Sequence, residues 1–457
     1  MTKTVILGLV PGIFIKGLIM KKAILSLCLA ASLSFFSTAQ TGARTITIDD
    51  AVNLALQNNL DIKQSKMDLE LLAQKNKYSW NSISPSISAS GGFNGDTPLG
   101  EGDTSFSYSL GASLNLTLTP ALRTTMKKAL LDYQSGQASL DTTKRRIELS
   151  VRKTFYSLIY FNDNLENQKR SLETAKQTYE ANQVKYKQGR LPELQLLNSQ
   201  YNYERKIPDI ENLKRTYQSN IDSFKLLLGL SLEEEITLEG KLDEAVSVHL
   251  DETNLQASLN SIEENSQIKA IKQQIISTEN TIQATKLSSY APSVTFSVSE
   301  STRGSSKENP VTGKDAWEPT SGLSYGVTVR VPLDNFFPWS SGKLNVESSE
   351  EALQKLKMNL EQTRTQTSLT VKNSYNSILQ ALTQLELLEK NVELTQKTYE
   401  MSKNAYNMGS VDLLSLQQAE DNLYSARYNV QNQKYTILTS ILTLEDTLGL
   451  PYGTLGK

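Results

Sequence analysis

The feature that most constrains this chain is a passage that occurs twice. Residues 186–200 read YKQGRLPELQLLNSQ and residues 406–420 read YNMGSVDLLSLQQAE, so the tyrosine, the glycine and two leucines recur 220 positions later (409 minus 189). The same offset aligns the Leu-Gly-Leu that begins at Leu228 with the one that begins at Leu448. Self-similarity at a fixed offset indicates a duplicated structural unit.

Within each copy, apolar residues follow a seven-residue period. In the first copy the series is Leu158, Leu165, Leu172, Tyr179 and Tyr186 before the glycine, then Leu196, Tyr203, Ile210, Tyr217 and Phe224 after it. Sustained heptads predict long helices that pack as coiled coils. Because no proline interrupts residues 121–188, that stretch alone predicts a helix of about 100 Å. Each copy is therefore expected to contain a long helix, a tight reversal at Gly189 or Gly409, and a second helix that returns beside the first.

A second period precedes each long helix. Every even position from Phe106 to Leu118 is apolar, the odd positions are small or polar, and residues 323–333 repeat the alternation. Shorter apolar alternations follow Pro85 and Pro292. The pattern predicts four strands in two hairpins, 85–119 and 292–334, whose polar loops span residues 94–104 and roughly 301–321.

The predicted sheet has the dimensions of a membrane span. A strand of the length of residues 106–118 crosses about 30 Å when tilted, which is the thickness of a bilayer core. Small polar residues on the opposite face suit a water-filled lumen, whereas the alternative is an ordinary half-buried sheet. Phe336, Phe337 and Trp339 follow the last strand, where a girdle at the membrane interface is expected. Four strands cannot close a barrel, and an open sheet edge is unfavourable in lipid, so several copies are expected to share one barrel.

The N-terminus resembles a secretory signal peptide. From Met20 the chain reads MKKAILSLCLAASLSFFSTAQ, which has the charged, apolar and small-residue parts of a signal peptide and predicts cleavage after Ala39. We interpret Met20 as the true start and residues 1–19 as an extension; the alternative is a double-length membrane anchor. Cys28, the only cysteine, precedes the cleavage site, so no disulfide is expected.

The composition argues against several classes of function. The net charge of −2 gives no sign of the basic surface that nucleic-acid binding requires. His249 is the only histidine, and the chain has no zinc spacing, GxxxxGK[ST] or GxGxxG motif. We therefore expect no enzymatic activity, no cofactor and no resident metal, and we assign Met401 and Met408 to packing.

The expected domain organisation follows the duplication. Its parts are a signal region at 1–39, a first repeat at 40–229, a connector at 230–252, a second repeat at 253–450 and a tail at 451–457.

These residues together resemble the TolC family of outer-membrane efflux proteins. The resemblance is carried by IDDAVNLALQNNLDIKQSKMDLE at 48–70, which looks like the opening helix of that family, by MGSVDLLSLQQAEDNLYSARYN at 408–429 and by the closing Leu-Gly-Leu. It implies a fold that is mainly α with transmembrane β strands, assembled as a homotrimer. Three copies of four strands would form a twelve-stranded barrel in the outer-membrane lipid, continued by a periplasmic α-helical barrel.

The resemblance also implies a function and partners. The trimer would be a passive exit duct for a tripartite efflux pump or a type I secretion system. An inner-membrane transporter of RND, ABC or MFS type would supply the energy through a periplasmic adaptor protein. Drug efflux, metal efflux and protein secretion all fit this architecture. The alternative is an exported, non-conducting coiled-coil protein with a structural or adhesive role, for which four lipid-facing strands would have no use.

Two groups of residues follow from this resemblance as candidate sites. The tip turns expected to contact the adaptor are Gly189, Arg190, Leu191, Gly409, Ser410 and Val411. The candidate pore constriction comprises Gln195, Asn198, Asp412, Ser415 and Gln418. Ser415 and Gln418 replace the pair of aspartates that gates well-known family members, so a narrow polar constriction is expected in place of an anionic one. Asp412, Glu420 and Asp421 are expected on a solvated face. Because Pro192 stiffens the first turn, the second tip is expected to be the one that moves.

Overall fold

The computed structural model describes residues 44–100, 105–242, 261–308 and 315–455. The chain divides into a small unit, whose described residues are Arg44, Thr45 and 234–237, and a larger unit that holds the rest. The predicted cleavage site at Ala39, Cys28 and His249 lie outside the described residues. Strands β1 (Arg44–Ile46) and β4 (Ile236–Leu238) pair with each other, and a hydrogen bond from the Arg44 amide to the Glu235 carbonyl, 2.9 Å long, precedes the pair.

The first repeat begins with two helices where the sequence predicted one over residues 48–70. Helix α2 (Ile48–Asn58) starts at a capping box between Thr47 and Asp50, and helix α3 (Leu60–Lys77) starts at Asn59. The expectation of a single helix was wrong because Asn59 accepts hydrogen bonds from the Asp61 and Ile62 amides. Its extended backbone therefore ends one helix and begins the next. The rest of the repeat comprises η1 (Ser79–Ile83), β2 (Ser86–Asp96), β3 (Ser105–Leu118), α4 (Leu122–Lys187) and α5 (Glu193–Leu228).

In the described residues, the second repeat has the same order of longer elements, namely a helix, two strands and two long helices, but its short 3-10 turns lie at other places. Its elements are η3 (Ser261–Glu264), α7 (Ser266–Tyr290), β5 (Ser293–Glu308), β6 (Asp315–Arg330), η4 (Asp334–Phe336), α8 (Ser341–Asn407) and α9 (Leu413–Leu448). Helices α4 and α8 have 66 and 67 residues, which confirms the prediction of very long helices. Helix α5 continues through Pro208.

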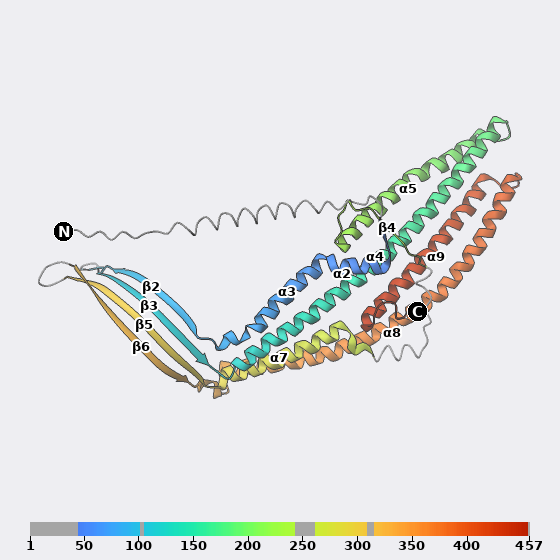
Figure 1. Ribbon diagram of the computed structural model, residues 1–457. Helices are drawn as coiled ribbons and strands as arrows, with labels where there is room; N and C mark the ends of the chain where they lie inside the picture. The colour runs from blue at the N-terminus through green and yellow to red at the C-terminus, as the bar shows by residue number, and fades with distance from the viewer. Residues whose placement is uncertain (1–43, 101–104, 243–260, 309–314, 456–457) are drawn as a thin grey trace, which may run out of the picture. The chain divides into compact units, whose positions relative to one another are not determined.

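The four long strands form one antiparallel sheet in the order β2-β3-β5-β6 (Figure 1). The two predicted hairpins are confirmed, but the second loop is shorter than the expected 301–321, because β5 extends to Glu308 and β6 begins at Asp315. The backbone ladder continues there through pairs such as Ser301–Gly322 and Thr302–Ser321. These residues carry no apolar alternation, which explains why the sequence pattern missed them.

The apolar face of the sheet is exposed. Apolar side chains from all four strands share this face; Ile87, Leu114, Val298 and Tyr325 form one row across it. Ile87 is 79% exposed and Tyr325 is 82% exposed. This exposure disfavours the alternative of an ordinary half-buried sheet, because such a sheet covers its apolar face with other elements. Among the described helices, none is both long enough and apolar enough to cross a membrane.

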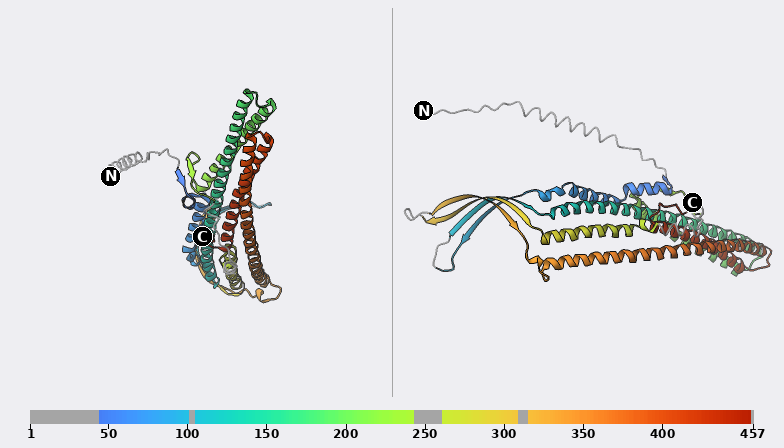
Figure 2. Two further views of the ribbon diagram at one scale, coloured as in Figure 1. Left: turned by 90° about the vertical axis from the view of Figure 1, so that its right-hand side faces the viewer. Right: turned by 90° about the horizontal axis from the view of Figure 1, so that it is seen from below.

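The long helices of the larger unit form two hairpins that lie side by side. Helix α4 packs against α5 in the first hairpin, α8 packs against α9 in the second, and α4 also packs against α9. The order across this array is therefore α5, α4, α9, α8, with α5 and α8 at opposite edges (Figures 1 and 2). The sheet lies at one end of the long helices and the two reversals lie at the other.

Both repeats end at a glycine that touches another backbone. Gly229 and Gly449 have φ of 71° and 70°, which is the left-handed conformation that favours glycine. An added Cβ would come within 2.7 Å of the Asn58 carbonyl oxygen at Gly229, and within 2.6 Å of the Glu264 carbonyl oxygen at Gly449. The repeated Leu-Gly-Leu thus marks the place where each second helix returns to the start of its own repeat.

Candidate functional site

The two tip turns have the same backbone geometry. Gly189 and Gly409 have φ of 70° and 76°, and an added Cβ at either would meet open space. The Gly189 amide bonds to the Tyr186 carbonyl and the Arg190 amide to the Lys185 carbonyl, at 2.8 and 2.9 Å. The second turn repeats this pair of bonds, which defines a Schellman motif at each helix end. The prediction of two equivalent tight reversals is confirmed.

The tip residues offer a polar and partly exposed surface. Gly189, Arg190, Gly409 and Ser410 are exposed, and the residues that follow, Leu191 and Val411, are half-buried. The two turns differ at the start of the returning helix. Asp412 caps α9 by accepting a hydrogen bond from the Ser415 amide at 2.9 Å, whereas Pro192 begins α5 without a side-chain cap. The hydrogen bonds from Ser415 lower the pKa of Asp412 below its ordinary value.

The candidate constriction residues do not meet within one chain. Asn198, Ser415 and Gln418 are exposed, Gln195 is half-buried, and Gln418 donates to Asn422 at 3.0 Å. Gln195 and Asn198 lie on α5 and the other candidates at α9, and α4 packs between these helices. A constriction built from these residues therefore requires further copies of the chain and stays a prediction.

Polar contacts join the two hairpins near the tips. Tyr406 donates to the Asn182 amide oxygen at 2.7 Å, and Asn182 is fully buried. Desolvation raises the pKa of Tyr406 above its ordinary value. Near the tips, the hairpins therefore contact each other through hydrogen bonds as well as through apolar packing.

A buried charged cluster lies farther from the tips. It joins Ser171 on α4, Lys206 on α5 and Glu420 on α9, and we call these three residues the polar node. The Lys206 ammonium donates to the Ser171 hydroxyl and lies 3.9 Å from the Glu420 carboxylate. The expectation that Glu420 lies on a solvated face was wrong, because Glu420 is only 3% exposed. Asp421 is half-exposed and lies 3.7 Å from the same ammonium.

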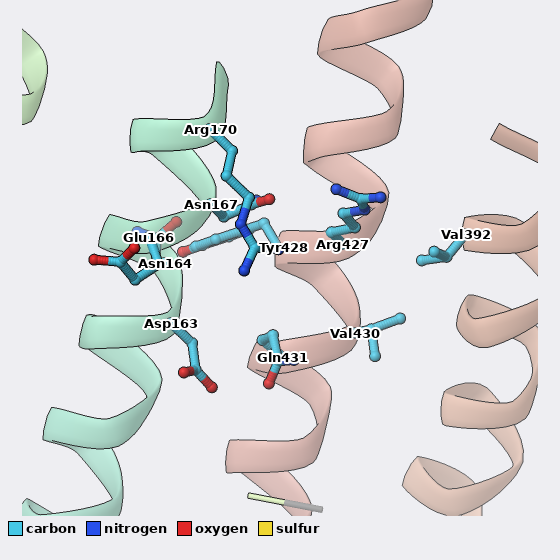
Figure 3. A pocket seen from close by; sticks show the side chains of 10 residues that line it. All are labelled: Asp163, Asn164, Glu166, Asn167, Arg170, Val392, Arg427, Tyr428, Val430 and Gln431. Atoms are coloured by element: carbon cyan, nitrogen blue, oxygen red, sulfur yellow. The ribbon is translucent and has the colours of Figure 1, made fainter. Parts of the chain in front are cut away.

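A groove between the hairpins lies next along the helices. It has a volume of about 390 Å³ and is lined from α4 by Asn167 and Arg170 and from α9 by Arg427 and Tyr428, among others. Figure 3 shows the side chains of Arg170 and Arg427 at this groove from the two facing helices. Asn167 donates to the Tyr424 carbonyl at 3.3 Å, so the contact between α4 and α9 remains polar here.

The sequence held a signal for these polar contacts that heptad counting passed over. Counted back from Leu448 and Ile441 in steps of seven, the second seam of α9 reaches Lys434, Arg427 and Glu420. Charged residues at seam positions indicate that the seam faces something other than an apolar partner. In the structure Glu420 lies at the contact with the first hairpin, and Arg427 lines the groove between the hairpins and donates to Gln396 of α8 at 2.7 Å. Lys434 is mostly buried and pairs with Glu389 of α8 at 3.1 Å.

No group of three or more histidine, cysteine, aspartate or glutamate side chains is arranged to hold a metal within the described ranges. The side chains at the tips and between the hairpins are instead connected to one another by the hydrogen bonds and ion pairs given above.

Comparisons with known proteins agree with this architecture. The profile of the family described as "Outer membrane efflux protein" matches residues 51–230 and 258–450. Toxin and drug export protein A of Aggregatibacter actinomycetemcomitans is 22% identical over 396 residues, which cover 86% of this chain and 83% of that protein.

Two solved structures have the same fold. The CusC structure aligns with a TM-score of 0.70 at 16% identity, covering 92% of this chain and 96% of that one. The outer membrane channel CmeC of Campylobacter jejuni aligns with a TM-score of 0.67 at 16% identity, covering 88% and 85% of the two chains.

Proposed function

The chain belongs to the outer membrane efflux protein family, and from this premise we propose that it is the passive exit duct of a tripartite efflux pump or a type I secretion system. Three copies form a twelve-stranded barrel in the outer membrane and a helical barrel through the periplasm. An inner-membrane transporter of RND, ABC or MFS type energises transport, and a periplasmic adaptor connects that transporter to the tip turns.

The main support for this proposal is the order of strands in the sheet. The duplication leaves one unpaired strand at each edge, and these two edge strands can pair with each other between copies. Within the described sheet, β2 and β6 each pair on one side only, and the central pair is β3 with β5. In chain order β2 corresponds to β5 and β3 to β6. The repeat-equivalent of the β3–β5 pair is therefore β6 of one copy with β2 of the next. A head-to-tail contact of this kind closes into a ring and removes both edges.

The edge helices support the same closure. Helix α8 exposes an apolar stripe at heptad spacing, Leu387, Leu394, Met401 and Met408, whose exposures are 57%, 63%, 73% and 76%. Subtracting 220 places Leu387 and Leu394 at Asn167 and Thr174 of α4, which contact Tyr424 of α9. The stripe therefore occupies the face that, in the first repeat, packs against a neighbouring hairpin.

Helix α5 offers the complementary edge. Its exposed apolar residues Leu197, Tyr201 and Ile207 correspond to Gln417, Asp421 and Arg427 of α9. Asp421 and Arg427 both lie at the contact between the hairpins. We infer that α8 of one copy packs against α5 of the next, as α4 packs against α9 within a copy. Two exposed apolar stripes at opposite edges support burial against each other.

The tips and the constriction complete the proposal. Gly189, Arg190, Leu191, Gly409, Ser410 and Val411 form six turns per trimer that contact the adaptor. Ser415 and Gln418, with Gln195 and Asn198, narrow the pore near this end, and the second tip is the mover. If Gln418→Ala leaves the closed-state conductance of a reconstituted trimer unchanged, the constriction lies elsewhere.

Cysteine crosslinking tests the ring directly. The contact between Thr174 and Tyr424 has its repeat-equivalent in Leu394 of one copy and Glu204 of the next. Because the Thr174 contact reaches the end of the Tyr424 side chain, the two equivalent positions are too far apart for a direct disulfide. A chain that carries Leu394→Cys and Glu204→Cys is therefore expected to form covalent trimers with a short bis-maleimide crosslinker. The matched control replaces Glu204→Cys by Gln218→Cys, on the same face of α5 but about 21 Å farther along it, where the crosslinker does not reach.

The same preparation separates the proposal from its rival. Heat-modifiable migration of the outer-membrane fraction and conductance in planar bilayers are expected. A protein found only in the soluble periplasm, without conductance, would support the non-conducting coiled-coil alternative. Conducting protein without the crosslink between positions 394 and 204 would instead show that the copies meet through other faces.

A further inference from the structure

The polar node holds a carboxylate that is poorly compensated for its burial. The Glu420 side chain is 4% exposed, its nearest cation is the Lys206 ammonium at 3.9 Å, and its hydrogen bond from the Ser171 hydroxyl is 3.4 Å long. That ammonium also donates a hydrogen bond to the Ser171 hydroxyl and pairs with the Asp421 carboxylate. A buried carboxylate normally needs close ion pairing and several hydrogen bonds to remain charged.

The surroundings of Glu420 come from all four long helices. Helix α4 contributes Ser171 and Thr174, and α5 contributes Lys206, with Arg205 on Asp421. Helix α8 contributes Lys403 and Tyr399, and α9 itself contributes Asp421, Tyr424 and Arg427. Burial raises the pKa of Glu420 above its ordinary value, and Lys206 opposes that shift.

From this geometry we propose that Glu420 is a proton-binding switch between the two helical hairpins. Proton uptake favours the arrangement in which α9 packs against α4 and α5, and proton release favours their separation. The inference rests on the proposed function in one respect, namely that separation of the hairpins widens the periplasmic entrance.

The direction follows from linkage. In the packed arrangement Glu420 is buried and holds its proton more tightly than in a separated, hydrated arrangement. Packing therefore takes up a proton at pH values between the ordinary and the raised pKa. Acidification through this window favours the packed arrangement, and a rise in pH through it favours separation. Each unit of difference in pKa between the two arrangements changes their ratio about tenfold.

The switch operates within a copy and not between copies. The positions 220 residues from Glu420, Lys206 and Ser171 are Gln200, Ala426 and Asn391. If neighbouring copies meet as proposed above, this equivalent set lies at the contact between them and contains no titratable group. The polar node therefore has no titratable equivalent at the contact between copies.

Distances between spin labels at the two tips test the proposal. Nitroxides are attached to Gln188→Cys and Met408→Cys in the full-length trimer, diluted with unlabelled chains so that distances within one copy dominate. Distance distributions are recorded at about pH 5 and about pH 7.5, both above the ordinary pKa of a glutamate. We expect the longer distances to gain population at the higher pH.

Three variants make the test specific. Glu420→Gln keeps the shape of the protonated acid and should hold the shorter distance at both pH values. Glu180→Gln, a control on an exposed carboxyl group of α4, should respond to pH as the parent chain does. Lys206→Met removes the opposing cation and should shift the response to higher pH. Melting curves verify that each variant is folded.

The outcomes separate the two proposals. A pH response that persists in Glu420→Gln, or a parent chain whose distances ignore pH, overturns the switch. Bilayer conductance is measured on the same samples. Conducting trimers without a Glu420-dependent response contradict the switch alone, whereas a Glu420-dependent change of distance without any conductance contradicts the exit-duct function alone.

Discussion

The ends of the two repeats have the same backbone conformation but opposite buried charges. Gly229 and Gly449 have the same left-handed conformation, and an asparagine side chain approaches each helix end: Asn59 donates to the Leu227 carbonyl and Asn265 to the Thr447 carbonyl, at 2.8 and 2.7 Å. Four residues before each glycine, however, the first repeat has Lys225 and the second has Glu445. Both are buried, with exposures of 4% and 0%.

The charge of Lys225 and that of Glu445 each suit the backbone groups of the segment that follows. After Gly229 the connector turns a carbonyl toward the helix, and the Lys225 ammonium donates to the Leu232 carbonyl at 2.9 Å. After Gly449 two backbone amides of the tail face the helix. The Glu445 carboxylate accepts hydrogen bonds from the amides of Gly453 and Leu455 at 2.9 and 2.8 Å. The comparison shows that the duplicated geometry is carried by the backbone and its glycines, whereas the buried side chain adapts to the next segment.

The largest effect is expected where the duplicated backbone leaves no space. Gly449→Ala and Gly229→Ala combine the strain of a left-handed alanine with a clash against a carbonyl, and should lower the free energy of unfolding by about 2–5 kcal/mol each. Gly189→Ala and Gly409→Ala are matched controls with the same φ but open space, and should cost only about 1–2 kcal/mol. Melting temperatures compare the four; equal losses would mean that the carbonyl contacts are not rigid.

A smaller loss of stability is expected from replacing either buried charge, and the loss should differ between Glu445 and Lys225. Glu445→Gln replaces one acceptor oxygen by a donor, so that the Gly453 or the Leu455 amide loses its partner, at about 1–3 kcal/mol. Lys225→Met keeps the apolar stem and removes the donor to the Leu232 carbonyl and to the Asp222 carboxylate, which is 41% exposed and can bond water instead, so the change should cost about 1 kcal/mol. Melting temperature and proteolysis of the C-terminal tail measure the difference. A larger loss from Lys225→Met would reverse the order inferred from the two sets of contacts.

The smallest effect concerns the tips. Asp412→Ala removes the cap of α9 and should lower the melting temperature slightly at neutral pH. The hydrogen bonds from Ser415 lower the pKa of Asp412, so the stabilisation is fully present above the ordinary aspartate pKa. It is lost as the pH falls through the lowered pKa. The difference in melting temperature between Asp412→Ala and the parent should therefore vanish in strong acid. A difference that persists there would have another origin.

Most of the architecture was predictable because two periods of the sequence report backbone geometry directly. The heptads and the glycines at 189 and 409 predicted both helical hairpins, and the alternation over residues 106–118 predicted a strand with one apolar face. Asn59 was missed because a polar residue inside a helical pattern signals a cap only through hydrogen bonds to its own following amides. The outer part of β5 was missed because its pairing depends on backbone bonds and not on apolar residues.

The contacts between hairpins were less predictable. Heptads indicate that a helix has a seam but do not say which helix faces it, so Glu420 was expected in solvent. Its partner Lys206 is distant in sequence and lies on a helix of the other repeat. The candidate residues Ser415 and Gln418 could be located on α9, but the proposed constriction requires neighbouring copies, which a single chain does not supply.

The difference between α4 and α8 has a consequence for where the assembled protein can open. Within a chain, α4 faces α9 with Asn167 and Thr174, whereas the equivalent positions of α8 are Leu387 and Leu394. Separating α4 from α9 at these positions lets water replace hydrogen bonds of similar strength; farther along, the Tyr160 ring would also leave Tyr435, on which it stacks at 5.4 Å. In the proposed trimer, separating α8 from the next copy would expose a seam of leucine and methionine to water, at about 25 cal/mol for each Å² exposed. Near the tips, solvation would therefore favour opening within each copy over opening between copies.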